Sequence, residues 1–71
     1  MTVWARINHV GWVHLWRSRE DFEAAKPSAH FLNARTDPRW VEVALTPEQR
    51  RALEAGELIE IEDPGFFDDE E

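Results

Sequence analysis

The most constraining feature of this sequence is a helix after residue 45 whose two ends are both marked by local signals. Thr46 and Gln49 have the spacing of a capping box, in which each side chain bonds the backbone N–H of the other residue. Pro47 follows at the first helical position, where no N–H is needed. Gly56 stands where a left-handed residue ends a helix. A helix from Pro47 to Ala55 is therefore predicted.

Strand-like segments flank this helix. Apolar residues alternate over residues 41–45, with the period of a strand that buries one face, and branched aliphatic residues return over residues 58–61. We therefore predict strand, helix and strand from Trp40 to Glu62. A helix of about 14 Å leaves little chain for a parallel crossover, so the last strand should be offset or lie at a sheet edge.

Residues 2–17 have the pattern of a β-hairpin, with aliphatic residues alternating on both arms. A three-residue loop at 9–11, with Gly11 in the left-handed position, would pair Ile7 with Val13 and keep the aliphatic residues on one face. A two-residue turn would mix the two sets, because a one-residue slip moves one arm's side chains to the opposite face. Gly11 favours the sorted register.

A short helix is predicted over residues 19–26. Ser18 and Asp21 have capping-box spacing, with Asp in place of the usual Glu, and acidic residues suit a helix amino terminus. Pro27 disfavours helical geometry at the residue before it, which should end the helix.

Residues 28–36 suit either a second helix or a strand. We favour the strand, because Asp37 and Pro38 are the preferred first two residues of a type I turn. Such a turn would pair this segment with residues 41–45 and place Leu32 opposite Leu45.

Together these elements predict one α+β domain over residues 1–62: a small antiparallel sheet of four or five strands with two short helices, in the order ββαββαβ. The helices would cover an aliphatic face made of Val3, Ile7, Val13, Leu15, Leu32, Val41, Val43, Leu45, Ile59 and Ile61. The opposite face would carry aromatic and basic residues, namely Trp4, Arg6, Trp12, His14, Trp16, Phe31, Arg35 and Trp40.

Tryptophan together with arginine is typical of interface cores, and a large apolar patch seldom stays exposed on a monomer. One hypothesis is that a second copy of the chain or another protein covers this Trp-rich face. The other interpretation is that the rings are ordinary core and that the register is misassigned. The sequence leaves both open.

Residues 63–71 are expected to form an acidic, flexible tail, the usual behaviour of a polar terminus. In one interpretation the acids only keep the protein soluble. In a second, Phe66 and Phe67 dock into an apolar groove of a partner while Asp68 and Asp69 meet its basic rim. In a third, the phenylalanines fold back over the Trp-rich face.

The formal net charge is −7, and five of the fifteen acidic residues lie in residues 63–71. Direct nucleic-acid binding is not expected, because neutralising phosphates requires clustered Lys and Arg and only eight are present, scattered along the chain. No secretory signal or long apolar run occurs, so we expect a cytoplasmic protein with no membrane contact.

No residue pattern typical of catalysis or metal binding is present. His9, His14 and His30 lack helical i, i+4 spacing, and there is no cysteine, so neither a metal nor a cofactor is expected. Ser18 is explained as a helix cap, and Ser28 belongs to no nucleophile elbow. The protein is therefore not expected to be an enzyme.

The segment VALTPEQRRALEAGELIEIED, residues 43–63, resembles a pattern of small accessory proteins of tailed phages: a strand, an L-T-x-E-Q helix start, a Gly ending and another short strand. The resemblance covers about a third of the chain. It implies a phage or mobile-element origin and assigns no functional residue.

These observations predict a non-catalytic protein-binding module, for instance a phage-encoded inhibitor or adaptor of a host protein, anchored by the Trp-rich face and the tail. The partner would offer a basic groove, and the carboxylates could mimic a nucleic acid there. The alternative is a small structural or assembly protein of a virion that self-associates, as a homodimer or higher oligomer, through the same face.

Overall fold

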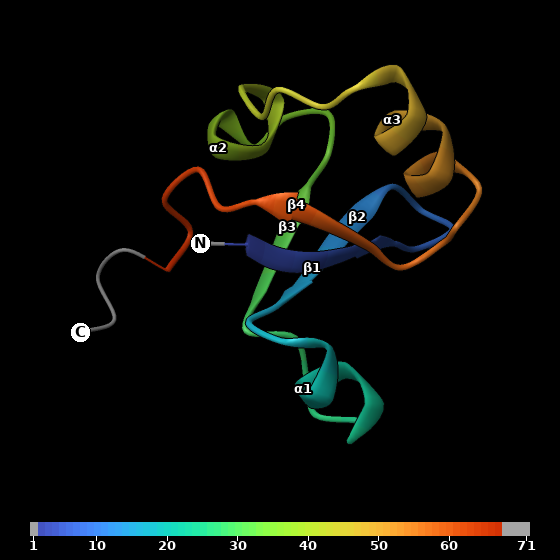
Figure 1. Cartoon of the computed structure of the whole chain (residues 1–71). Helices are drawn as coiled ribbons and strands as arrows, with labels where there is room; N and C mark the ends of the chain where they lie inside the picture. The colour runs from blue at the N-terminus through green and yellow to red at the C-terminus, as the bar shows by residue number, and fades with distance from the viewer. Residues whose placement is uncertain (1, 68–71) are drawn as a thin grey trace.

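In the computed structural model, which describes residues 2–67, four antiparallel strands form one sheet in the order β3-β2-β1-β4 (Figure 1). The α+β class and the antiparallel sheet are confirmed. The elements are, in chain order, β1 (Thr2–Ile7), β2 (Trp12–Trp16), α1 (Arg19–Glu23), β3 (His30–Asn33), α2 (Pro38–Val41), α3 (Pro47–Glu54) and β4 (Ile59–Glu62).

The hairpin of β1 and β2 has the sorted register, with Ile7 opposite Val13. Gly11 has a φ of 92° and donates its N–H to the Asn8 carbonyl at 3.2 Å. The Asn8 side-chain oxygen accepts from the N–H groups of Val10 and Trp12, each at 3.0 Å. The three-residue loop therefore places the aliphatic residues of both arms on one face.

The predicted strand over residues 41–45 is wrong. Asp37 caps α2 by accepting from the Arg39 N–H at 3.0 Å, and Pro38 occupies the first helical turn, so the Asp-Pro pair starts a helix and not a hairpin turn. Residues 42–46 have no regular secondary structure. The observed order of the described elements is therefore ββαβααβ.

Residues 28–36 do contain a strand, β3, but its partner differs from the predicted one. Leu32 lies opposite Val13 of β2 and not opposite Leu45. The free side of β1 is taken by β4, which pairs Ala5 with Ile59. The last strand lies at a sheet edge, as predicted, and both sides of the hairpin are occupied.

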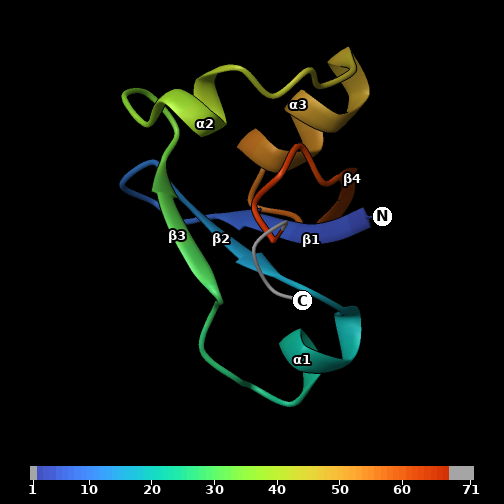
Figure 2. The same ribbon diagram turned by 90° about the vertical axis from the view of Figure 1, so that its left-hand side faces the viewer.

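Helices α2 and α3 lie on one side of the sheet and α1 lies on the other (Figures 1 and 2). The core forms between the sheet and helices α2 and α3. Its buried residues are Val3, Ala5, Val13, Leu15, Leu32, Trp40, Leu53, Ile61, Phe66 and Phe67. Trp40 is only 6% exposed, so its assignment to the Trp-rich face is wrong: α2 turns its indole into the core.

Helix α3 has the predicted capping box. The Thr46 hydroxyl accepts from the Gln49 N–H at 3.1 Å, and the Gln49 side-chain oxygen accepts from the Thr46 N–H at 3.0 Å. The Gln49 amide also donates to the Glu60 carbonyl at 3.4 Å, which links the helix start to β4. Gly56 ends the helix with a φ of 83°.

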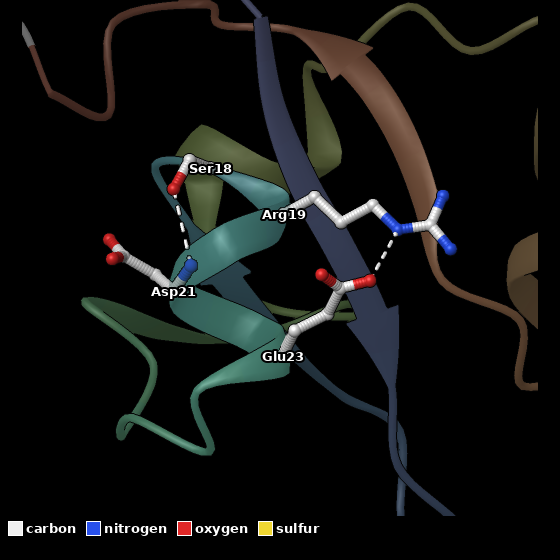
Figure 3. A network of polar contacts seen from close by, with 4 residues as sticks. All are labelled: Ser18, Arg19, Asp21 and Glu23. Carbon is white, nitrogen blue, oxygen red and sulfur yellow. Dashed lines mark hydrogen bonds and ion pairs between the residues drawn. The ribbon is translucent and has the colours of Figure 1, made fainter.

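Helix α1 starts as predicted but is shorter. Ser18 accepts from the Asp21 N–H at 3.2 Å (Figure 3). The helix ends at Glu23, three residues before Lys26, because Ala25 adopts a left-handed φ of 57°.

The start of the predicted tail belongs to the core. The Asp63 carboxylate accepts from the N–H groups of Gly65 and Phe66, at 2.9 and 2.7 Å, and this turn brings the chain back over the sheet. Phe66 and Phe67 are 1% and 5% exposed. They fold back as one interpretation held, but onto the aliphatic face, where Phe66 contacts Trp40 with ring centroids 6.3 Å apart. The packed region thus extends beyond the expected boundary at residue 62.

Candidate protein-binding face

The sheet surface opposite the core carries six of the twelve predicted binding residues, and we call it the aromatic face. The strand register places its members side by side: Trp4 lies opposite Trp16, Arg6 opposite His14, and His14 opposite Phe31. The aromatic face consists of Trp4, Arg6, Trp12, His14, Trp16 and Phe31.

The rings of β2 and β3 form a continuous row on this face. Phe31 stacks on Trp12, with centroids 4.7 Å apart and planes inclined by 26°, and contacts His14 at 4.3 Å. His14 in turn stacks on Trp16 at 5.9 Å. Phe31 remains 48% exposed, which is unusual for a phenylalanine in a strand. The row is therefore open to solvent at the end formed by Trp12 and Phe31.

Helix α1 covers the other end of the row. The Phe22 ring packs edge-on against Trp16 at 4.9 Å, and the Trp16 indole N–H donates to the Lys26 carbonyl at 3.0 Å. The Arg19 guanidinium lies 5.5 Å from the Trp4 ring centre and pairs with Glu23 at 3.1 Å (Figure 3). These contacts leave Trp16 only 9% exposed.

His14 is held by two polar side chains that the sequence did not indicate. Because the Asn8 oxygen already accepts two backbone N–H groups, its amide nitrogen faces His14 Nε2, at 3.4 Å. His14 Nε2 must then accept, so the proton lies on Nδ1 and is donated to the Ser28 hydroxyl at 3.1 Å. Burial, and to a smaller extent the nearby Arg6 charge, lowers the pKa of His14 below its ordinary value.

This tautomer bears on the one serine–histidine contact near the aromatic face. A general base must present a lone pair to the nucleophile's proton. In this arrangement His14 Nδ1 donates to Ser28, and its lone pair on Nε2 faces the Asn8 amide. The contact therefore orients the imidazole ring and does not activate the Ser28 hydroxyl.

An open groove of about 660 Å³ borders the aromatic face on the side of α3. Its lining includes His14, Trp16, Phe22 and the end of α3. Arg6 connects the two sides, because its Nε donates to the Gly56 carbonyl at 3.2 Å. Arg6 is thus held at the border of the face.

The β4 side of this surface is acidic. Glu60 lies opposite Trp4 and Glu62 opposite Thr2, so both carboxylates are on the same side of the sheet as the aromatic rings. The Thr2 hydroxyl donates to Glu60 at 2.7 Å. An aromatic centre therefore has an acidic border, which the sequence could not show because β4 and β1 are far apart along the chain.

Four other predicted binding residues lie elsewhere. Trp40, Phe66 and Phe67 are buried in the core on the other side of the sheet, so they do not belong to the aromatic face. Arg35 is exposed but follows the end of β3, where its N–H donates to the Asn33 side chain at 2.9 Å, and it does not belong to the aromatic face. The predicted contacts Asp68 and Asp69 lie outside the described residues.

Two kinds of feature are absent from the described residues. No group of three or more His, Asp or Glu side chains within residues 2–67 could hold a metal ion. No helix that the structure describes is long and apolar enough to cross a membrane.

No family model, no curated protein and no solved structure matches the chain.

Proposed function

We propose that this protein is a non-catalytic protein-binding module that docks its partner on the aromatic face. The observation that carries the proposal is Phe31: an aromatic ring 48% exposed at the open end of a stacked row, on a sheet face that α1 covers only at its other end. Buried aromatic anchors supply most of the binding energy in protein interfaces, and rigid stacked rings lose little entropy on binding.

The charges around the aromatic face define the partner's chemistry. Glu60 and Glu62 border the rings, and the whole chain carries a formal charge of −7. Complementary charges speed association and disfavour wrong partners. The partner therefore offers an apolar pocket or ridge with a basic rim.

The resemblance of residues 43–63 to phage accessory proteins gives this proposal its most specific form, an inhibitor or adaptor of a host protein. Mimicry of a nucleic acid is a variant in which Glu60, Glu62 and other carboxylates occupy a basic groove of the partner.

Site-specific photocrosslinking tests the proposal. A photoreactive phenylalanine analogue replaces Phe31, and in matched controls it replaces Val10 or Val41, which are 63% and 57% exposed. We expect one protein adduct from position 31 in the cells that make the protein, none from the controls, and loss of that adduct when Trp12 is also changed to Ala.

Affinity measured with the purified adduct partner completes the test. We expect Trp12→Ala to weaken binding by about 2 kcal/mol, as for a typical hot spot. Equal crosslinking from all three positions, or no adduct from position 31, would refute docking on the aromatic face. Adducts between two copies of the chain would instead support a self-associating structural protein.

A further inference from the structure

A second surface, on the α2–α3 side, has the features of a small-ligand site. The structure contains a groove of about 460 Å³ between these helices, near the hairpin loop, within the size range of typical ligand pockets. Its apolar lining comes from Ile7, Trp40, Val41, Val43, Leu45 and Leu53.

The last residue of α2 and the segment that joins α2 to α3 supply half of these six apolar residues. Val41, Val43 and Leu45 are the residues whose alternation predicted a strand, yet none of them lies in one. Val43 and Leu45 are half-buried against the core, and Val41 is 57% exposed. An apolar segment without a strand partner therefore opens onto solvent beside the core.

Two arginines at this groove have no partner in the described part of the chain. Arg35 and Arg50 both line it, and neither side chain has a hydrogen bond or ion pair with residues 2–67. By contrast, Arg19, Lys26 and Arg39 each lie within 4.0 Å of a carboxylate. In a chain with fifteen acidic and eight basic residues, two unpaired cations beside one apolar groove leave a local surplus of positive charge.

A donor on the groove wall adds to this chemistry. The Trp40 indole N–H has no hydrogen-bond partner among the described residues. Within residues 2–67, the one fully buried side-chain polar atom without a partner is His30 Nε2, so the Trp40 N–H reaches solvent. Glu54 also lines the groove, one helical turn from Arg50, and its negative charge disfavours binding of an anion.

We propose that this groove binds a small organic acid with an apolar body, such as a medium-chain carboxylate. Its apolar part occupies the lining of Val41, Val43 and Leu45, and its carboxylate meets Arg35 and Arg50, because guanidinium groups match carboxylates in charge and in hydrogen-bond geometry. This site is separate from the aromatic face and does not depend on the function proposed for that face.

Nuclear magnetic resonance titration of the full chain with octanoate tests the site. The chain has four tryptophans, so each indole N–H gives its own reporter signal. We expect saturable movement of the Trp40 signal with a Kd of about 1 mM or tighter, while Trp4, Trp12 and Trp16 stay in place. Octanol and octylammonium, which lack the carboxylate, should bind more weakly.

Charge variants then identify the carboxylate contacts. Arg35→Gln and Arg50→Gln should each weaken octanoate binding about fivefold, the scale of an exposed ion pair, and Glu54→Gln should tighten it. Arg51→Gln is the matched control, because Arg51 is the next residue on α3, is exposed and does not line the groove. All four are surface changes that leave the core intact.

Three results would overturn the proposal. The first is binding that does not depend on charge, seen either as octanol binding as tightly as octanoate or as unchanged affinity in an Arg35 and Arg50 double variant. The second is movement of the Trp12 signal in place of Trp40, which would assign the ligand to the aromatic face. The third is a Trp40 signal that moves with protein concentration alone, which would show that a second copy fills the groove.

Discussion

The two faces of the sheet are built from alternate residues of the same strands, yet they differ in what covers them. On one face, β1 and β2 contribute Val3, Ala5, Val13 and Leu15, each 0% exposed beneath α2, α3 and residues 63–67. On the other, the same strands contribute the aromatic face, which α1 covers at one end. The first face forms the core of the fold, whereas the second leaves Phe31 48% exposed at the end that α1 does not cover.

This difference shows how a short chain can divide its apolar residues between a covered core and the surface that we propose for binding. A core of this size leaves a thin stability margin. Placing Trp40, Phe66 and Phe67 in the core enlarges the apolar area that the covered face buries. The stacked row of Trp12, Phe31 and His14 lies outside this core, on the opposite face of the sheet.

The largest expected effect comes from truncating matched phenylalanines on the two faces. Phe66→Ala should destabilise the protein by about 3 kcal/mol, because Phe66 is 1% exposed, whereas Phe31→Ala should cost about 1 kcal/mol or less. Urea denaturation measures both. If Phe66→Ala does not fold, Phe66→Leu should still fold with a loss of about 1 kcal/mol. Equal losses at the two positions would contradict the distinction between the faces.

The helices on the two sides end in the same motif with different residues, which offers a second comparison. In α3 the N–H groups of Gly56 and Glu57 bond the carbonyls of Leu53 and Ala52. Gly56→Ala should destabilise the protein by about 1 kcal/mol, because an added Cβ meets nothing within 4 Å and the cost is that of the left-handed backbone alone. Thermal unfolding measures the loss, and an unchanged Tm would show that the backbone relaxes there.

In α1 the N–H groups of Ala25 and Lys26 bond the carbonyls of Phe22 and Asp21 in the same way, but the left-handed residue is an alanine. Ala25→Gly should stabilise the protein by about 0.5 kcal/mol. Glycine removes the strain of a left-handed alanine backbone, and this gain is larger than the stability lost through the greater conformational entropy of glycine in the unfolded chain. The measurement is the same unfolding midpoint. A loss of stability would indicate that Ala25 is not strained.

The smallest expected effect is a pH dependence located on the aromatic face. The folded-state pKa of His14 is lowered, so its contribution is fully present above about pH 6.5 and is lost as pH falls toward the folded-state pKa. The urea midpoint should therefore fall less in His14→Gln than in the native protein between about pH 7.5 and about pH 5.5. Arg6→Gln should raise the pKa of His14, read from its imidazole proton signals. If the urea midpoint of His14→Gln falls with pH as much as that of the native protein, the pH dependence does not come from His14.

Local patterns predicted those features whose causes are local. Gly11 and the alternation of the hairpin arms set the register of β1 and β2, and Thr46 with Gln49 sets the start of α3. The alternating residues 41–45 misled because they do not join the sheet, although the outer edge of β3 has no neighbour among the described strands. Asp37 instead caps helix α2, which ends at Val41, and Val43 and Leu45 pack against the core from an irregular segment.

The features of the candidate site also fall into those that local sequence patterns predict and those that depend on distant segments. Most of the aromatic face follows from the hairpin register and was predicted, including Trp4, Trp12, His14 and Trp16. The hydrogen bonds of Asn8 and Ser28 to His14, the acidic border from β4 and the cover of α1 were not, because each joins segments that no local pattern relates.

From the sequence alone, the backbone periods and caps of the hairpin, α1 and α3 could be derived, because a few neighbouring residues decide these energies. The tertiary structure decided which side of the sheet would be covered. It placed Phe66, Phe67 and Trp40 over the aliphatic face and left Phe31 exposed on the other, since that choice depends on the total apolar area that distant segments bury together.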